Sequence, residues 1–183
     1  MKDLLNPSQR SYLLSLVRDT IQHYLRTKEP LEPKTEDSLL KDVRGAFVTL
    51  HQGGRLRGCI GSIVATKPLY LEIRDMAIAA STQDSRFSPV SEGELADIRI
   101  EISVLSPFKK IVNSDEIIVG KHGVLVKQGY KSGVYLPQVA KETGWGKEEF
   151  MNSLCRDKAG ISVDSWKRGE CEIYIFSAEV FGE

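Results

Sequence analysis

The sequence predicts an α+β fold of mostly antiparallel strands, in two halves of similar organisation. Each half has short apolar runs joined by a glycine-containing turn, then apolar residues at helical spacing, then a run in which apolar and polar residues alternate. Strands joined by a hairpin pair in antiparallel fashion, whereas a doubly wound α/β fold needs helical crossovers between parallel strands. We therefore expect helices packed on antiparallel strands.

The first helix is predicted to begin at Asn6 and Pro7. Asn6 suits the N-cap, Pro7 suits the first helical position, and Gln9 can return a hydrogen bond as in a capping box. The apolar face that follows is made of Leu13, Leu16, Val17, Ile21, Tyr24 and Leu25. The polar residues 29–37, which include prolines, are expected to form a loop.

A hairpin is predicted next, from residues 45–50 and 55–63, with its turn in the HQGG segment between them. A second helix is expected to start at Pro68, and it ends in the polar segment 81–89. Residues 98–105 alternate between branched apolar and polar side chains, which predicts a strand with one buried face.

The second half is expected to repeat this organisation. Its elements are a first hairpin strand, two helices and a last alternating strand, at residues 122–129, 137–144, 147–160 and 171–181. We interpret the likeness as an internal duplication in which residues 45–62 correspond to residues 122–138. The prediction is a single domain over residues 1–183 with two lobes.

Composition argues against two classes of partner. The 25 basic and 25 acidic residues cancel, so the chain has no strong field for a nucleic-acid backbone. The N-terminus is too polar for a signal peptide, and no stretch approaches the length of a membrane span. Cys59, Cys155 and Cys171 are odd in number and widely spaced, which argues against a disulfide framework, and no pair has zinc-ligand spacing. We expect a cytoplasmic protein without a metal site.

The segment RLRGCIGS, residues 55–62, contains the main candidate for chemistry. In a straight strand Arg57 would share a face with Cys59, and a nearby cation favours the reactive thiolate. Gly58 and Gly61 would let a ligand approach the backbone closely. Cys59 and Arg57 are therefore candidate catalytic residues, and the two glycines are candidate ligand-binding residues. The alternative is that Cys59 is a small core residue and that the glycines admit a neighbouring strand.

Three further residues are candidate ligand-binding groups. Asp84 and Arg86, in the segment DSRFSP, can form a polar pair at the edge of a cleft, and Gln138 can present its amide from the start of a helix. The alternatives are a capped helix end with a surface ion pair, and ordinary helix-start chemistry around Pro137. His122 is the best candidate for a general base, although no cysteine–histidine pair follows from the sequence.

The hexamer LRGCIG, residues 56–61, resembles the signature of the AMMECR1 family. The segments GAFVTL, DSRFSP, EISVLSP, GVYLPQVAKETGW and LCRDKAG carry the same resemblance, which extends over about residues 45–181. It implies an AMMECR1-domain protein, similar to protein A of the AmmeMemoRadiSam system. It also implies two structural repeats on a continuous, curled sheet, and a cleft beside the hexamer.

The resemblance names neither a reaction nor a cofactor. Prokaryotic members are often encoded with Memo-like and radical SAM proteins, so it implies such partners. We expect an enzyme, or an accessory subunit of one, that binds a small anionic ligand beside the hexamer. Cys59 would be the nucleophile or attachment site, and Arg57 would favour the thiolate or hold the anion. The alternative is a non-catalytic interaction module for the same partner proteins.

Overall fold

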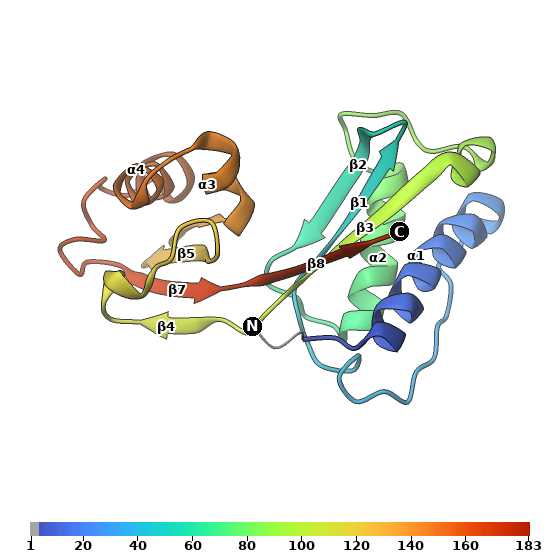
Figure 1. The fold of residues 1–183 in the computed structure, drawn as a ribbon, viewed down its shortest axis with the longest axis horizontal. Coiled ribbons are helices and arrows are strands. Elements are labelled where there is room, and N and C mark those ends of the chain that lie inside the picture. Colours follow the sequence, from blue (N-terminus) through green and yellow to red (C-terminus); the bar gives the residue numbers. More distant parts are fainter. Residues whose placement is uncertain (1–3) are drawn as a thin grey trace. The chain divides into compact units, whose positions relative to one another are not determined.

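The protein is represented by a computed structural model that describes residues 4–183 (Figure 1). The chain forms two compact units. The first contains the residues up to Leu105 together with Glu179–Glu183, and the second contains Ser106–Ala178.

The first unit is a four-stranded sheet with two helices on one face. Its elements are α1 (Pro7–Thr27), β1 (Ala46–Gln52), β2 (Arg55–Ser62), α2 (Leu69–Thr82), the 3₁₀ helix η1 (Glu92–Asp97), β3 (Ile98–Leu105) and β8 (Ala178–Gly182). The strand order is β2-β1-β3-β8. Alternate residues of β1 and β3, among them Val48 and Ile102, form one core with the apolar faces of α1 and α2.

The local signals in this unit act as the sequence predicts. Asn6 and Gln9 form the capping box of α1, and Pro7 is its first residue. The β1–β2 turn contains Gly53 and Gly54, whose φ angles of 56° and 75° suit a tight hairpin turn.

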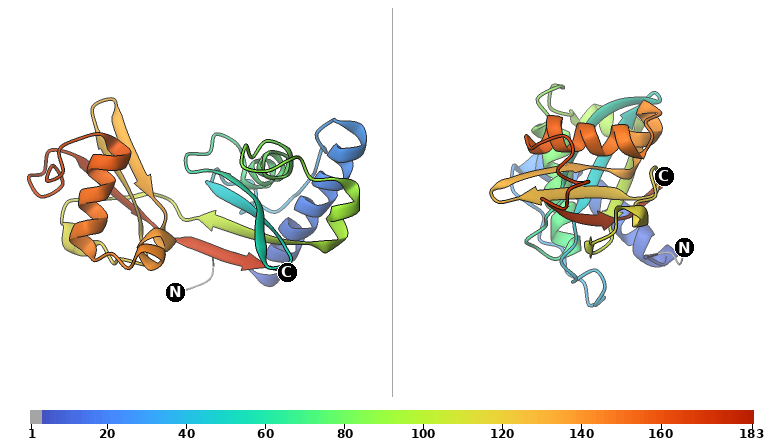
Figure 2. Two further views of the ribbon diagram at one scale, coloured as in Figure 1. Left: turned by 90° about the horizontal axis from the view of Figure 1, so that it is seen from above. Right: turned by 90° about the vertical axis from the view of Figure 1, so that its left-hand side faces the viewer.

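The second unit has the same kind of architecture. Its elements are β4 (Lys109–Ile111), the 3₁₀ helix η2 (Ser114–Glu116), β5 (Gly123–Gln128), β6 (Lys131–Tyr135), α3 (Pro137–Thr143), α4 (Lys147–Ser153), the π-helix η3 (Leu154–Ala159) and β7 (Glu172–Phe176). The strand order is β4-β7-β5-β6. Phe150 and Leu154 pack with Val126 and Ile173, so α4 and η3 cover one face of this sheet (Figure 2).

Corresponding elements occupy corresponding places in the two sheets. In each sheet the second hairpin strand lies at an edge, and the first hairpin strand and the strand after the helices follow in order. The fourth position is exchanged, because β4 follows β3 along the chain but pairs with β7, whereas β8 follows β7 but pairs with β3. This common order is what an internal duplication predicts, and the duplication itself stays a prediction.

Two expectations about the sheet need correction. The continuous curled sheet is not confirmed, because the strands form two four-stranded sheets. The last strand, predicted over residues 171–181, is divided at Ser177 into β7 and β8, which belong to different sheets. The physical reason lies at Ser177, whose N–H donates to Ser106 Oγ at 2.9 Å while its carbonyl accepts from the Ser106 N–H at 2.9 Å.

Candidate functional site

Cys59 lies on β2, which is an edge strand of the first sheet. Its cross-strand neighbour is Thr49 of β1, whose Oγ1 lies 3.2 Å from Cys59 Sγ, and the next residue in this row is Glu101 of β3. Val48 and Leu50 point into the core that contains α1 and α2. Since side chains alternate along a strand, the row of Cys59, Thr49 and Glu101 lies on the opposite face. The half-buried thiol is therefore part of a polar row across three strands.

Two side chains from the loop after α2 bind the backbone of Cys59. Asp84 Oδ2 accepts the N–H of Cys59 at 2.9 Å, and Arg86 Nη2 donates to the Cys59 carbonyl at 3.3 Å. Arg86 also donates to both carboxylate oxygens of Asp84, at 2.9 and 2.7 Å. Asp84 is buried, and the side chain of Arg86 is 55% exposed. The outward N–H and carbonyl groups of an edge strand normally bind water or an added strand. At Cys59 the Asp84–Arg86 pair binds these two groups instead.

The charges in this cluster stabilise one another. The hydrogen bond from Arg86, with further bonds from the backbone N–H groups of Cys59 and Arg86, holds the pKa of Asp84 well below its usual range despite burial. The bond to Asp84 raises the pKa of Arg86, and the charge of a Cys59 thiolate acts in the same direction. Arg86 Nη1 donates no hydrogen bond to any of residues 4–183. The guanidinium thus keeps donors for a ligand.

Arg57 is directed elsewhere by a β-bulge. The register of β2 on β1 skips Arg57, which is the extra residue of the bulge, so the straight strand assumed from the sequence is not present. Its guanidinium donates to Glu94 Oε1 at 2.9 Å and to the carbonyl of Ser88 at 2.9 Å. The bond from Arg57 lowers the pKa of Glu94 to about 2. A catalytic role for Arg57 stays a prediction, while these contacts assign it to holding the loop after α2 on β2.

The two glycines beside Cys59 both have a packing reason. A Cβ atom on Gly58 would overlap the carbonyl oxygen of Ala80, so α2 packs directly on the β2 backbone. A Cβ atom on Gly61 would overlap the ring of Phe47, which covers this position from β1. Packing therefore accounts for both glycines, and their predicted role in ligand binding remains a prediction.

The histidines are placed differently from the expectation. His51 is in β1, two residues from Thr49, so it lies on the face that carries Cys59, diagonally across from the thiol. The sequence assigned His51 to a turn, and only the hairpin register reveals this position. His122 belongs to the second unit, where its Nδ1 accepts the N–H of Ile118 at 3.2 Å and burial lowers its pKa.

Neither Gln138 nor the lining of the two described cavities includes a residue of the Cys59 cluster. Gln138 is the second residue of α3 and belongs to the second unit, so the cluster on β2 is built without it and its role stays a prediction. One cavity of about 460 Å³ opens in the second unit, and a smaller one lies along α1. In the part of the chain that the structure describes, no three His, Cys, Asp or Glu residues gather as a metal site would require.

Fold and site together define an α+β protein with two four-stranded sheets. A cysteine on an edge strand of one sheet has its backbone N–H bound by a buried carboxylate. The AMMECR1 family model matches residues 14–181. The chain belongs to the AMMECR1 family.

Relatives agree along nearly the whole chain. A protein of Methanopyrus kandleri is 41% identical over 192 aligned positions, which cover 100% of this chain and 92% of the relative. A protein of Pyrococcus furiosus is 39% identical over 183 positions, which cover 94% and 87% of the two chains. The crystal structure of an uncharacterized protein from Pyrococcus horikoshii has the same α+β fold, with a TM-score of 0.84 at 35% identity, over 99% of this chain and 94% of that one.

Membrane insertion by a helix finds no support. Within residues 4–183, none of the helices combines the length and the apolar character that crossing a bilayer requires.

Proposed function

We propose that this AMMECR1-domain protein is an enzyme, or an accessory subunit of one, that binds a small anionic ligand beside Cys59. The observation that carries the proposal is the Asp84–Arg86 pair on the backbone of Cys59. A cysteine that only fills space needs no such arrangement, since free cysteine behaves as a small apolar residue. A thiol that must meet a reacting atom does need a fixed backbone, because small misplacements are costly in catalysis.

The contacts of the two arginines favour Arg86 over Arg57 as the cation of this proposed site. Arg57 is bound to Glu94 and to backbone carbonyls, whereas Arg86 is half exposed and keeps free donors next to Cys59. Arg86 is therefore the cation that can hold the anionic group of a ligand. Cys59 is then the nucleophile or attachment site, and Thr49 Oγ1, at 3.2 Å from the sulfur, can exchange a hydrogen bond with it.

The test compares two alkylating reagents of nearly equal size, anionic iodoacetate and neutral iodoacetamide, on folded protein. We expect Arg86→Met to lower the ratio of the iodoacetate rate to the iodoacetamide rate at Cys59 by about fivefold, because a half-exposed charge about 4 Å away, screened as in water, contributes about 1 kcal/mol. The rates are read at each cysteine by peptide mass spectrometry. A ratio cancels differences in access, so it reports the local charge.

Arg57→Met is the matched control. It removes an arginine on the same strand as Cys59, but the charge of this arginine is already paired with Glu94. It should leave the ratio within about twofold of the wild-type value. The proposal fails if Cys59 is alkylated only after unfolding, or if Arg86→Met and Arg57→Met change the ratio equally.

The alternative is a non-catalytic module that docks Memo-like or radical SAM proteins, and exposed apolar side chains favour it. Leu56 on β2 is 40% exposed, and Val64 just after this strand is 63% exposed. Strand addition at Cys59 is disfavoured, because its backbone groups are already bound. This alternative would be supported if Leu56→Asp no longer bound a purified Memo-like protein while its Cys59 alkylation stayed unchanged. Cys59→Ser should then still bind that protein.

A further inference from the structure

Cys155 and Cys171 meet in the second unit, although 15 residues separate them in the sequence. Cys155 lies on the π-helix η3 and is fully buried. Cys171 directly precedes β7, is half buried and packs on the same core. Both side chains belong to this one core, and each thiol lies close enough to shift the pKa of the other.

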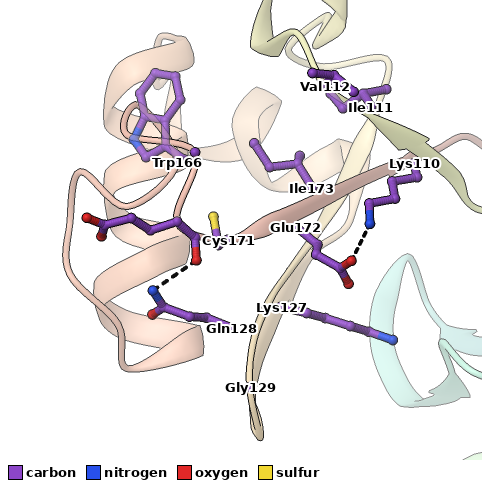
Figure 3. Close-up of a pocket in the computed structure, with 12 residues that line it drawn as sticks. Lys110, Ile111, Val112, Lys127, Gln128, Gly129, Trp166, Cys171, Glu172 and Ile173 are labelled. Carbon is purple, nitrogen blue, oxygen red and sulfur yellow. Dashed lines mark hydrogen bonds and ion pairs between the residues drawn. The ribbon is translucent and has the colours of Figure 1, made fainter.

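One of these two thiols borders an open cavity. Figure 3 shows Cys171 on the wall of the cavity of about 460 Å³, with Trp166, Gln128 and Lys127 also on its wall. Cys155 is not among the lining residues and is fully buried in the core. The pair therefore consists of a thiol that a small molecule can reach and a thiol that only its neighbour can reach.

The two thiols also differ in their acid–base properties. The hydrogen bond from Cys155 lowers the pKa of Cys171, whereas the same bond together with burial raises the pKa of Cys155. Cys171 is therefore the thiol of the pair that loses its proton more readily, and Cys155 is the one that keeps it. The thiolate is the nucleophile of thiol–disulfide exchange, so the reachable sulfur is also the better nucleophile.

We propose that Cys171 and Cys155 form a thiol–disulfide exchange site that takes small disulfides of the glutathione and cystine class. The site belongs to the second unit and is independent of the function proposed for Cys59. Gln128 on the cavity wall has an amide oxygen that can accept a hydrogen bond from the amides that such disulfides carry, while its amide nitrogen donates to the Glu170 carbonyl at 3.0 Å. Cys155 lies on a π-helix, a form that often marks functional sites.

The exchange balances in two steps. The Cys171 thiolate attacks one sulfur of the small disulfide, forms a mixed disulfide and releases the other half as a thiolate. Cys155 then attacks the Cys171 sulfur, its proton passes to the second departing thiolate, and a Cys155–Cys171 disulfide forms. The two protein sulfurs are oxidised and the small disulfide is reduced to two thiols.

The test uses the full chain, reduced and then incubated with oxidised glutathione, with acid quenching and peptide mass spectrometry. We expect the masses of the wild-type protein and of Cys59→Ser to fall by two hydrogens. The disulfide crosslink should map to Cys155 and Cys171. Cys155→Ala should instead accumulate one glutathionyl group on Cys171. In the reduced, folded protein, alkylation of Cys171 should exceed that of Cys155 by at least about tenfold.

The wild-type experiment decides the question even where a variant fails to fold. A stable glutathionyl adduct on Cys171 with Cys155 still reduced would overturn the proposal. So would a protein that stays fully reduced, or a crosslink that forms only in denaturant. The Cys59→Ser arm keeps this outcome separate from that of the function proposed for Cys59, because the crosslink does not involve Cys59.

Discussion

Gly58→Ala is expected to lower the free energy of unfolding by about 3 kcal/mol, the upper end of what overpacking usually costs. The added Cβ would overlap the carbonyl oxygen of Ala80, and that oxygen is helix backbone, not the movable end of a side chain. To relieve the overlap, α2 must move off the β2 backbone and disturb the core of the first unit. Urea unfolding followed by circular dichroism measures the loss.

Gly93→Ala is the matched control, since a Cβ atom there meets nothing within 4 Å and its free energy of unfolding should change by less than about 0.5 kcal/mol. Gly133→Ala should resemble Gly58→Ala, because its Cβ would meet the backbone of Lys158 and Ala159 in η3. Equal stability of Gly58→Ala and Gly93→Ala would show that α2 does not pack on β2 as described.

The regular elements were predictable because their signals are local. The capping box at Asn6 and Gln9, the glycine turn between β1 and β2, and the alternation in residues 98–105 each depend on a few neighbouring residues. The division of residues 171–181 into two strands was not predictable in this way. Alternation continues on both sides of Ser177, and its partner Ser106 is far away in the sequence.

Three of the candidate residues could be found from the sequence, but their contacts could not. The sequence singled out Cys59, Asp84 and Arg86, and the structure brings these three together. It paired Cys59 with Arg57, because a single chain segment gives no sign of a bulge whose position depends on the partner strand. His51 was missed for a related reason, since only the hairpin register places it on the face of Cys59.

The proximity of Cys155 and Cys171 could also not be predicted from the sequence. Spacing detects cysteine pairs in short zinc or redox motifs, but this pair is closed by a π-helix and the loop that returns to β7. Sequence spacing therefore treated both as isolated thiols, whereas the fold places them in one core.

Asp84→Ala is expected to lower the free energy of unfolding by about 2–3 kcal/mol, because it leaves the N–H of Cys59 without its charged acceptor. Asp84→Asn should cost less, about 1–2 kcal/mol, since an amide oxygen still accepts this bond but no longer pairs with Arg86 as a charge. Both variants should also change the alkylation rate of Cys59, because they release the backbone that positions the thiol. Chemical denaturation and peptide mass spectrometry give the two readouts.

The same carboxylate should make stability depend on pH below about 4. The pKa of Asp84 is lowered in the folded protein, chiefly by the bond from Arg86, so the unfolded chain binds more protons in this range. Its contribution is therefore present above the pKa of the unfolded chain and is lost as the pH falls toward the folded pKa. Asp84→Asn should flatten this part of the stability curve.

Glu94→Gln tests whether a loss of acid-dependent stability by itself changes the alkylation of Cys59. Arg57 lowers the pKa of Glu94 to about 2, so this carboxylate also contributes stability that disappears in acid, but it does not contact Cys59. Glu94→Gln should flatten the acid limb as Asp84→Asn does, while alkylation of Cys59 at neutral pH stays within about twofold of wild type. If Glu94→Gln alters alkylation as strongly as Asp84→Asn, the Asp84–Arg86 pair has no special relation to the thiol. If Asp84→Asn alone alters it, the pair positions Cys59 as the structure indicates.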